Sequence, residues 1–300
     1  MTKLVDLSHP WNIHTPPWVG YPSTKIYYFQ RMQTNGIVSM YIETSLHMGT
    51  HFDAAMHIVE GGGDIASIPL DVLYGDGVIV DISDRVGEFD IIRPEHFEGK
   101  VEIRPGDILI YHTGWHHYYT GEREQNETKY MCKHPGGYRE LAQWKIDMKF
   151  KWTGFDLGSD DHPMNTSISW RRPDIREEFE RKLGKKLEEV FPKEHEFVMH
   201  RKCFPEGVLH VENIGGDIDQ VLNRRCKIGA FPWRFEGGEG AMCRVVALRM
   251  SFRIAIPVWR RECGRNSRRS SADGGGELPQ AHPSGSQKPV IPHRSWEAWL

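Results

Sequence analysis

The stretch His47–His57 has the sequence HMGTHFDAAMH and places three histidines and one aspartate within eleven residues. Imidazole and carboxylate groups together suit zinc, manganese or iron(II). A regular helix would turn Asp53 away from His47 and His51, whereas a straight strand would separate His47 from Asp53 by ~20 Å. Ligands of one ion lie ~2 Å from it, so the segment must bend, and Gly49 permits the bend. The stretch therefore predicts a metal site where a strand runs into a turn and then a helix.

The residues around this stretch predict a mixture of strands and helices. Strands are expected where short β-branched runs follow turn signals or where polarity alternates, at Ile37–Leu46, Val78–Ile82, Asp107–Tyr111 and Val245–Leu248. Helices are expected at Tyr138–Met148 and Pro173–Leu183. Because strands and helices do not alternate strictly, the pattern predicts a single domain of the α/β (α+β) class over residues 1–250.

The composition changes near residue 250. Residues 251–300 contain eight Lys and Arg against four Asp and Glu, although the whole chain has 38 against 41. This segment is rich in Arg, Ser, Gly and Pro and has no sustained apolar period. Such a composition cannot bury a core, so residues 251–300 are predicted to be a disordered C-terminal tail.

The overall composition excludes several classes of function. A formal charge of −3 argues against a nucleic-acid partner, and no stretch approaches the ~20 apolar residues of a membrane span. The N-terminal residues lack a hydrophobic signal core. The five cysteines are an odd number and form no C-x-x-C pair, which favours reduced thiols over a disulfide framework. A cytoplasmic protein is therefore expected.

The His47–His57 stretch resembles the H-x-G-T-H-x-D-x-P-x-H signature of the cyclase family, which includes bacterial kynurenine formamidases and isatin hydrolases. It matches every fixed position except Ala55, where the family usually has proline. The resemblance covers most of residues 1–250 and continues in Asp6–Pro10, Pro17–Gly20, Asp107–Ile110 and Thr113–Trp115. It implies a single domain of the kynurenine formamidase-like swivelling β/α type.

The resemblance also implies a set of metal ligands. His47, His51 and Asp53 would hold a first divalent ion, zinc or manganese. In two-metal relatives Asp53 would bridge to a second ion held by His200 and Glu212. Since the isatin-hydrolase branch resembles a single-manganese site, one or two ions per chain are expected.

Other roles follow from the same resemblance. His57 would be the catalytic acid and base rather than a ligand. Trp18 would contact the substrate, and His162 would face the substrate or the ligands, with a purely structural role at least equally open. His210 would share a strand face with Glu212 but could also be a core histidine.

The expected reaction is hydrolysis of a C–N bond in a small aryl formamide, lactam or cyclic imide by metal-activated water. The alternatives are a metal-dependent lyase, isomerase or cyclase acting on a small carbonyl substrate, and a non-catalytic metal-binding module. Retention of His57 disfavours the module, which needs no acid or base. The stretch His195–His200 resembles the protease motif H-E-x-x-H but is one residue too long. The expected partners are a small-molecule substrate and further copies of the chain, in a homodimer or homotetramer.

Overall fold

The computed structural model describes residues 2–250, so the predicted tail at 251–300 lies outside the described residues. The strands are β1 Thr2–Asp6, β2 Lys25–Gln30, β3 Ser39–Glu43, β4 His51–Asp53, β5 Tyr74–Asp81, β6 Ile91–Ile92, β7 Ile108–His112, β8 Gly136–Gly137, β9 Trp152–Phe155, β10 Leu209–Glu212, β11 Arg224–Pro232 and β12 Gly240–Met250. The α-helices are α1 Met32–Asn35, α2 Leu70–Leu73, α3 Glu127–Cys132, α4 Arg139–Asp147, α5 Ile168–Arg171, α6 Pro173–Leu183, α7 Leu187–Val190 and α8 Val198–Cys203. Short 3₁₀ turns, labelled η, lie between them.

The main sheet closes on itself. Its strand order is β1-β12-β11-β5-β7-β9-β10-β4, and β12 also pairs with β4. The strands from β12 round to β4 therefore form a barrel, and β1 extends β12 on the outside of this ring. Strands β5, β7, β9 and β10 run parallel, whereas β4, β11 and β12 pair antiparallel with their neighbours. Closure leaves the ring without a free edge.

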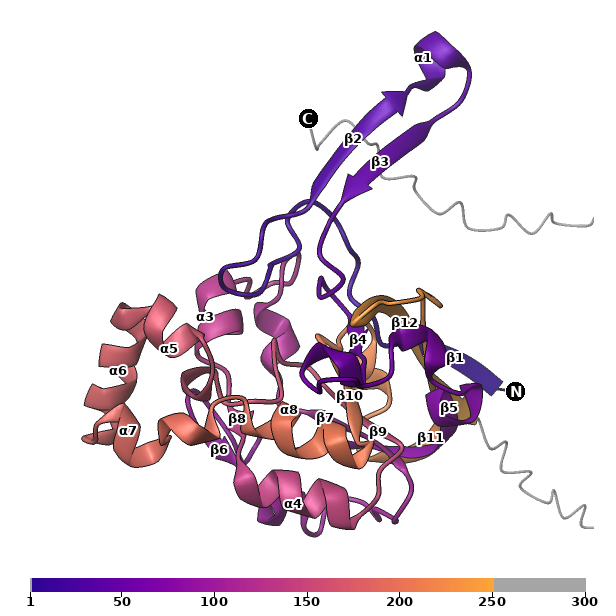
Figure 1. Cartoon of the computed structure of the whole chain (residues 1–300). Helices are drawn as coiled ribbons and strands as arrows, with labels where there is room; N and C mark the ends of the chain where they lie inside the picture. The colour runs from indigo at the N-terminus through magenta and orange to yellow at the C-terminus, as the bar shows by residue number, and fades with distance from the viewer. Residues whose placement is uncertain (1, 251–300) are drawn as a thin grey trace, which may run out of the picture. The chain divides into compact units, whose positions relative to one another are not determined.

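Both faces of the central parallel strands are covered. Every residue of β7, β9 and β10 is buried, as expected for parallel strands with helices on one side and a packed interior on the other. Helices α4 and α8 pack against each other, and α4 is the lower of the two in Figure 1. The predicted strands and helices are all present, and α6 begins and ends where the sequence placed it.

One hairpin differs from the rest of the domain. Strands β2 and β3 pair only with each other, and the hairpin that they form with α1 extends away from the barrel (Figure 1). Most of its residues are exposed, including large apolar ones such as Phe29 at 61% and Met40 at 51%. Among residues 2–250, no helix is both long enough and apolar enough to cross a membrane.

Candidate metal centre and active site

The His47–His57 stretch bends as its sequence predicts. Gly49 has φ = 67°, a left-handed conformation that glycine adopts without strain. The chain then enters β4, whose three residues are all buried, and continues into the 3₁₀ turn η1, Ala55–His57. The expected order of strand, turn and helix is therefore present, with a single 3₁₀ turn in place of an α-helix.

Asp53 lies at the centre of four imidazoles. Its Oδ1 atom lies 2.8 Å from His47 Nδ1 and 3.2 Å from His51 Nε2. Its Oδ2 atom lies 3.0 Å from His210 Nε2 and 3.5 Å from His200 Nε2. The two carboxylate oxygens thus face two separate pairs of histidines, which is the arrangement a bridging carboxylate between two ions requires.

Strand pairing explains why these distant residues meet. β10 runs antiparallel to β4, with His210 opposite Asp53 and Glu212 opposite His51. Glu212 lies on the same face of β10 as His210, because side chains two residues apart in a strand share a face. Its carboxylate lies 3.4 Å from His210 Nε2 and 3.5 Å from His51 Nε2. The position of His210, left open by the sequence, is therefore inside this cluster.

The residues present fit one or two divalent cations. The possible ligand atoms of one group lie within 4.8 Å of one another in Asp53, His200, His210 and Glu212. The same holds for a second group of His47, Asp53 and His57. Three buried atoms, His47 Nε2, His51 Nε2 and Asp53 Oδ1, make no hydrogen bond of regular geometry within the described residues, although Asp53 Oδ1 lies close to two imidazoles. Buried polar atoms normally have partners, and a cation at this position would supply one.

Two of the histidines, His51 and His200, are held in place by hydrogen-bond partners at their Nδ1 atoms. His51 Nδ1 lies 2.7 Å from the Gly49 carbonyl oxygen, and His200 Nδ1 lies 2.6 Å from Asp161 Oδ2. An N–H donated to such an acceptor fixes the tautomer and leaves Nε2 as the ligand atom. Asp161 also accepts the Met199 backbone N–H at the start of α8, so it positions both the helix and the ring that the helix carries.

Protonation in the metal-free chain follows the same geometry. Burial alone would lower the pKa of His47, but the negative charge of the adjacent Asp53 carboxylate outweighs it and raises the pKa to about 10. Burial dominates at His57, with further lowering from neighbouring imidazoles, so the pKa of His57 is lowered to about 3. A cation must displace the proton of His47 when it binds. His57 is therefore neutral near pH 7 in the metal-free chain.

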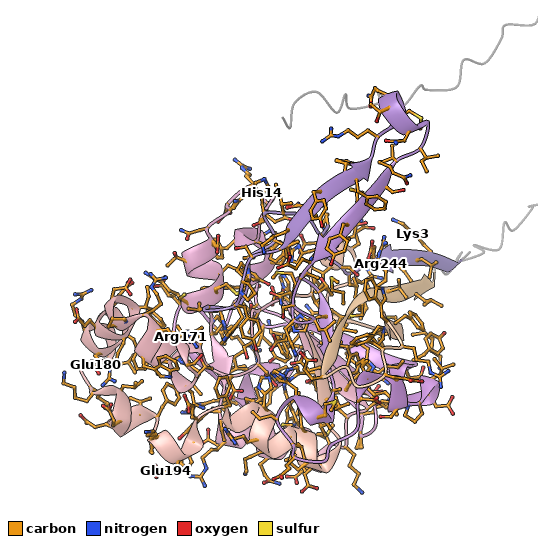
Figure 2. The ribbon with its side chains drawn as sticks, turned by 45° about the horizontal axis from the view of Figure 1, so that its top comes forward. Lys3, His14, Arg171, Glu180, Glu194 and Arg244 are labelled. Carbon is orange, nitrogen blue, oxygen red and sulfur yellow. The ribbon has the colours of Figure 1, made fainter. Side chains whose placement is uncertain are left out.

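A cavity of about 330 Å³ opens onto the cluster. His57 and Trp18 both line it, and the ring centroid of His57 lies 4.1 Å from that of His47. Arg171, labelled in Figure 2, lies at the C-terminal end of α5 and also lines the cavity. The lining thus combines an aromatic ring, a neutral imidazole and a guanidinium beside the cluster.

The structure places His162 away from the cavity. This side chain is fully buried and is not among the residues that line the cavity. Its Nε2 atom lies 3.0 Å from the Phe89 carbonyl oxygen, and its Nδ1 atom accepts the Met164 backbone N–H. Burial lowers the pKa of His162 to about 3. These contacts agree with the structural role that the sequence had left open for His162.

Comparisons with known proteins agree with this fold. The family model Cyclase, described as "Putative cyclase", matches residues 5–162. A kynurenine formamidase of Erythrobacter litoralis (strain HTCC2594) is 33% identical over 97 residues, which are 32% of this chain and 45% of that relative. The chain thus spans less than half the length of the curated relative that it matches.

Solved structures show the same architecture. Isatin hydrolase A from Ralstonia solanacearum superposes with a TM-score of 0.64 at 19% identity, covering 82% of this chain and 92% of that one. A potential metal-dependent hydrolase with cyclase activity superposes with a TM-score of 0.59 at 20% identity, covering 84% and 100%. The barrel is therefore a fold that this chain shares with these structures. Because the family model covers more than half of the sequence, the chain belongs to the cyclase family.

Proposed function

We propose that this chain is a metal-dependent hydrolase that cleaves the C–N bond of a small aryl formamide, lactam or cyclic imide. The observation that carries the proposal is the cavity that His57 lines together with His47, His51, Asp53, His200 and Glu212, a buried cluster of histidines and carboxylates. Membership of the cyclase family and the kynurenine formamidase relative support the same chemistry.

The proposed centre holds one or two ions of zinc or manganese. His47, His51 and Asp53 would bind the first ion, since Asp53 Oδ1 lies 2.8 Å from His47 Nδ1 and 3.2 Å from His51 Nε2. Asp53, His200 and Glu212 would bind the second, to which His210 adds a further donor. When bound, such an ion supplies Lewis acidity, which lowers the pKa of water and stabilises negative charge on a carbonyl oxygen.

The side chains of this chain supply the remaining functions. His57 accepts a proton from the attacking water and returns it to the leaving nitrogen, as a general base and then a general acid. Trp18 offers a flat apolar surface to an aromatic substrate. Amide hydrolysis produces a carboxylate, and the Arg171 guanidinium on the cavity wall can attract it.

Protein purified without chelator tests this proposal against a panel of formamides, lactams and imides. We expect zinc or manganese by elemental analysis and turnover that disappears with chelator and returns with the ion. The products should contain one added water. Full activity without metal would contradict the proposal, and products without added water would indicate a lyase or isomerase instead.

Glu212→Ala tests for the second ion. Glu212 contacts the second group of ligands through His210, whereas the first ligands His47 and Asp53 remain in place. We expect zinc content at saturation to fall by one ion per chain, measured by elemental analysis after dialysis. Glu206→Ala, which changes an exposed glutamate nearby, serves as the control and should change nothing. An unchanged zinc content in Glu212→Ala would show a centre with a single ion.

We also propose that the active form is a homodimer or homotetramer, with the β2–β3 hairpin in the contact between copies. Contiguous apolar surface of this kind marks interaction sites. The exposed side chains of the hairpin extend from both strands into open space in Figure 2. Tyr27 and Tyr41 stack across the strands with ring centroids 5.1 Å apart, which gives the hairpin a rigid aromatic surface.

Phe29→Glu tests the hairpin contact. Phe29 is 61% exposed, so the substitution leaves the packing of the monomer intact. Loss of a central aromatic anchor typically costs about 2 kcal/mol or more, which weakens association more than about tenfold. Light scattering over a concentration series should show this shift. Lys25→Ala, which removes one side of the exposed ion pair with Glu43 on the same hairpin, is the control. A wild-type monomer at micromolar concentration would refute the assembly.

A further inference from the structure

A second group of histidines lies at the carboxyl ends of the parallel strands, among residues that do not line the cavity. His112 is the last residue of β7, and His116 and His117 lie in the 3₁₀ turn η4, Trp115–Tyr118. Asp219 approaches from the 3₁₀ turn η8, Ile218–Gln220. Possible ligand atoms of these four residues all lie within 4.8 Å of one another. The carboxyl edge of parallel strands is also where α/β proteins commonly bind ligands.

Carboxylates contact the Nδ1 atoms of two of these rings and so orient them. His112 Nδ1 lies 2.9 Å from Asp81 Oδ1, at the end of β5. His116 Nδ1 lies 3.3 Å from Asp156 Oδ2, in the residue that follows β9. When both Nδ1–H groups donate to these carboxylates, both Nε2 atoms carry a free lone pair. A carboxylate behind an imidazole is the arrangement found repeatedly behind metal-bound histidines.

The free nitrogens face Asp219. His112 Nε2 and His116 Nε2 each lie 3.7 Å from one of its two carboxylate oxygens. This distance is too long for a hydrogen bond. It is close to the roughly 3.4 Å that separates two ligand atoms held ~2 Å from a tetrahedral ion. The spacing therefore leaves room for a cation between the three side chains.

His112 supplies an independent sign of a missing partner. Its side chain is only 4% exposed, and its Nε2 atom has no hydrogen-bond partner in the described structure. His116 is 2% exposed. His117 and Asp219 are exposed, so the group has a buried side that is already oriented and an open side through which an ion can enter.

We propose that His112, His116, His117 and Asp219 form a separate binding site for a divalent transition-metal ion, with zinc the best match. Three imidazoles and one carboxylate suit zinc in tetrahedral coordination. The ion would tie the turn that carries Asp219 to the end of β7, which gives it a structural role. The site is distinct from the centre at Asp53, and the proposal does not depend on the hydrolase activity.

The full-length chain and zinc itself provide the test. The double variant His117→Ala/Asp219→Ala changes only exposed side chains, so its fold should survive. The matched control is His14→Ala/Asp217→Ala, which removes an exposed histidine, labelled in Figure 2, and an exposed aspartate of the same turn. Equilibrium dialysis against buffered free zinc, with elemental analysis, gives the number of ions and their affinities. Thermal melting with and without zinc gives an independent readout, because an ion that binds only the folded chain raises the melting temperature.

We expect the double variant to bind one zinc ion fewer per chain than the wild type and to lose part of the zinc-induced rise in melting temperature. The control should match the wild type. The double variant combined with Glu212→Ala should bind two zinc ions fewer per chain than the wild type. Each change removes one ion, and separate sites act independently. Asp81→Asn should keep the ion but weaken its affinity about 10–100-fold, as expected when the partner behind a ligand is altered. Equal zinc binding by the wild type and the double variant, or a difference only above millimolar free zinc, would overturn the proposal.

Discussion

Replacing Asp53 by asparagine is expected to remove bound metal from the candidate active centre and, with it, the turnover of the enzyme. Asp53 Oδ1 faces His47 and His51, and Oδ2 faces His200 and His210, at distances between 2.8 and 3.5 Å. Asparagine keeps the shape of the side chain but loses its negative charge and one acceptor oxygen. Both groups of ligands therefore lose the carboxylate that they share.

The same substitution should destabilise the metal-free chain. Burial alone would raise the pKa of Asp53, yet the facing imidazoles hold it well below its usual range. Removing one member of a buried charged pair typically costs about 3–5 kcal/mol. Elemental analysis, denaturant unfolding and the substrate panel measure the three effects. Asp71→Asn changes an exposed aspartate and should leave all three unchanged. An Asp53→Asn protein that keeps its metal and its turnover would show that this carboxylate is not a ligand.

Much of the barrel could be predicted because its strands are locally distinctive. The β-branched runs within β5, β7 and β12 follow turn signals; the apolar residues of the first two are buried, whereas buried and half-buried residues alternate in the third. The order of the strands could not be predicted, because it depends on pairings between distant segments such as β4 with β12. The closure of the sheet therefore cannot be predicted from local sequence periodicity.

The candidate site also has features that the local sequence predicts and features that depend on distant strand pairings. The bend at Gly49 and the proximity of His47 to Asp53 could be predicted, because both depend on residues within one short segment. The place of His210 became certain only when β10 paired with β4 and set it opposite Asp53. Glu239, 3.5 Å from His47 Nε2, carries no signal in the sequence, because it arrives from the loop before β12.

The adjacent residues Asp161 and His162 show why sequence proximity is a poor guide to function. Asp161 accepts the Nδ1–H of His200 and so supports a candidate ligand. His162 instead packs among aromatic rings, with its ring centroid 4.7 Å from that of Phe191 and 5.4 Å from that of Phe179. Imidazole is a common catalytic group, yet of these two residues it is the aspartate that contacts a candidate metal ligand.

His57→Ala is expected to lower turnover by about 10²–10⁴-fold, the usual contribution of a positioned acid or base, while the chain keeps its metal. The reason lies in the position of the ring. His57 lines the cavity from the turn η1 and lies beside His47, but it makes no ion pair with Asp53 in the described structure. His47, His51 and Asp53 remain to hold the ion when the ring of His57 is removed.

Metal content and turnover must be measured on the same preparation, because the ligand atoms of His57, His47 and Asp53 also lie within 4.8 Å of one another. Met56→Ala, which shortens the exposed neighbouring side chain in the same turn, controls for disturbance of η1 and should retain turnover. His57→Gln keeps a polar side chain that cannot exchange a proton near pH 7, so it should lose as much turnover as His57→Ala. Loss of the ion in either variant would make His57 a ligand and would leave the acid and base to another residue of the cavity. Near-normal turnover with the ion in place would show that proton transfer in this centre does not need the imidazole at all.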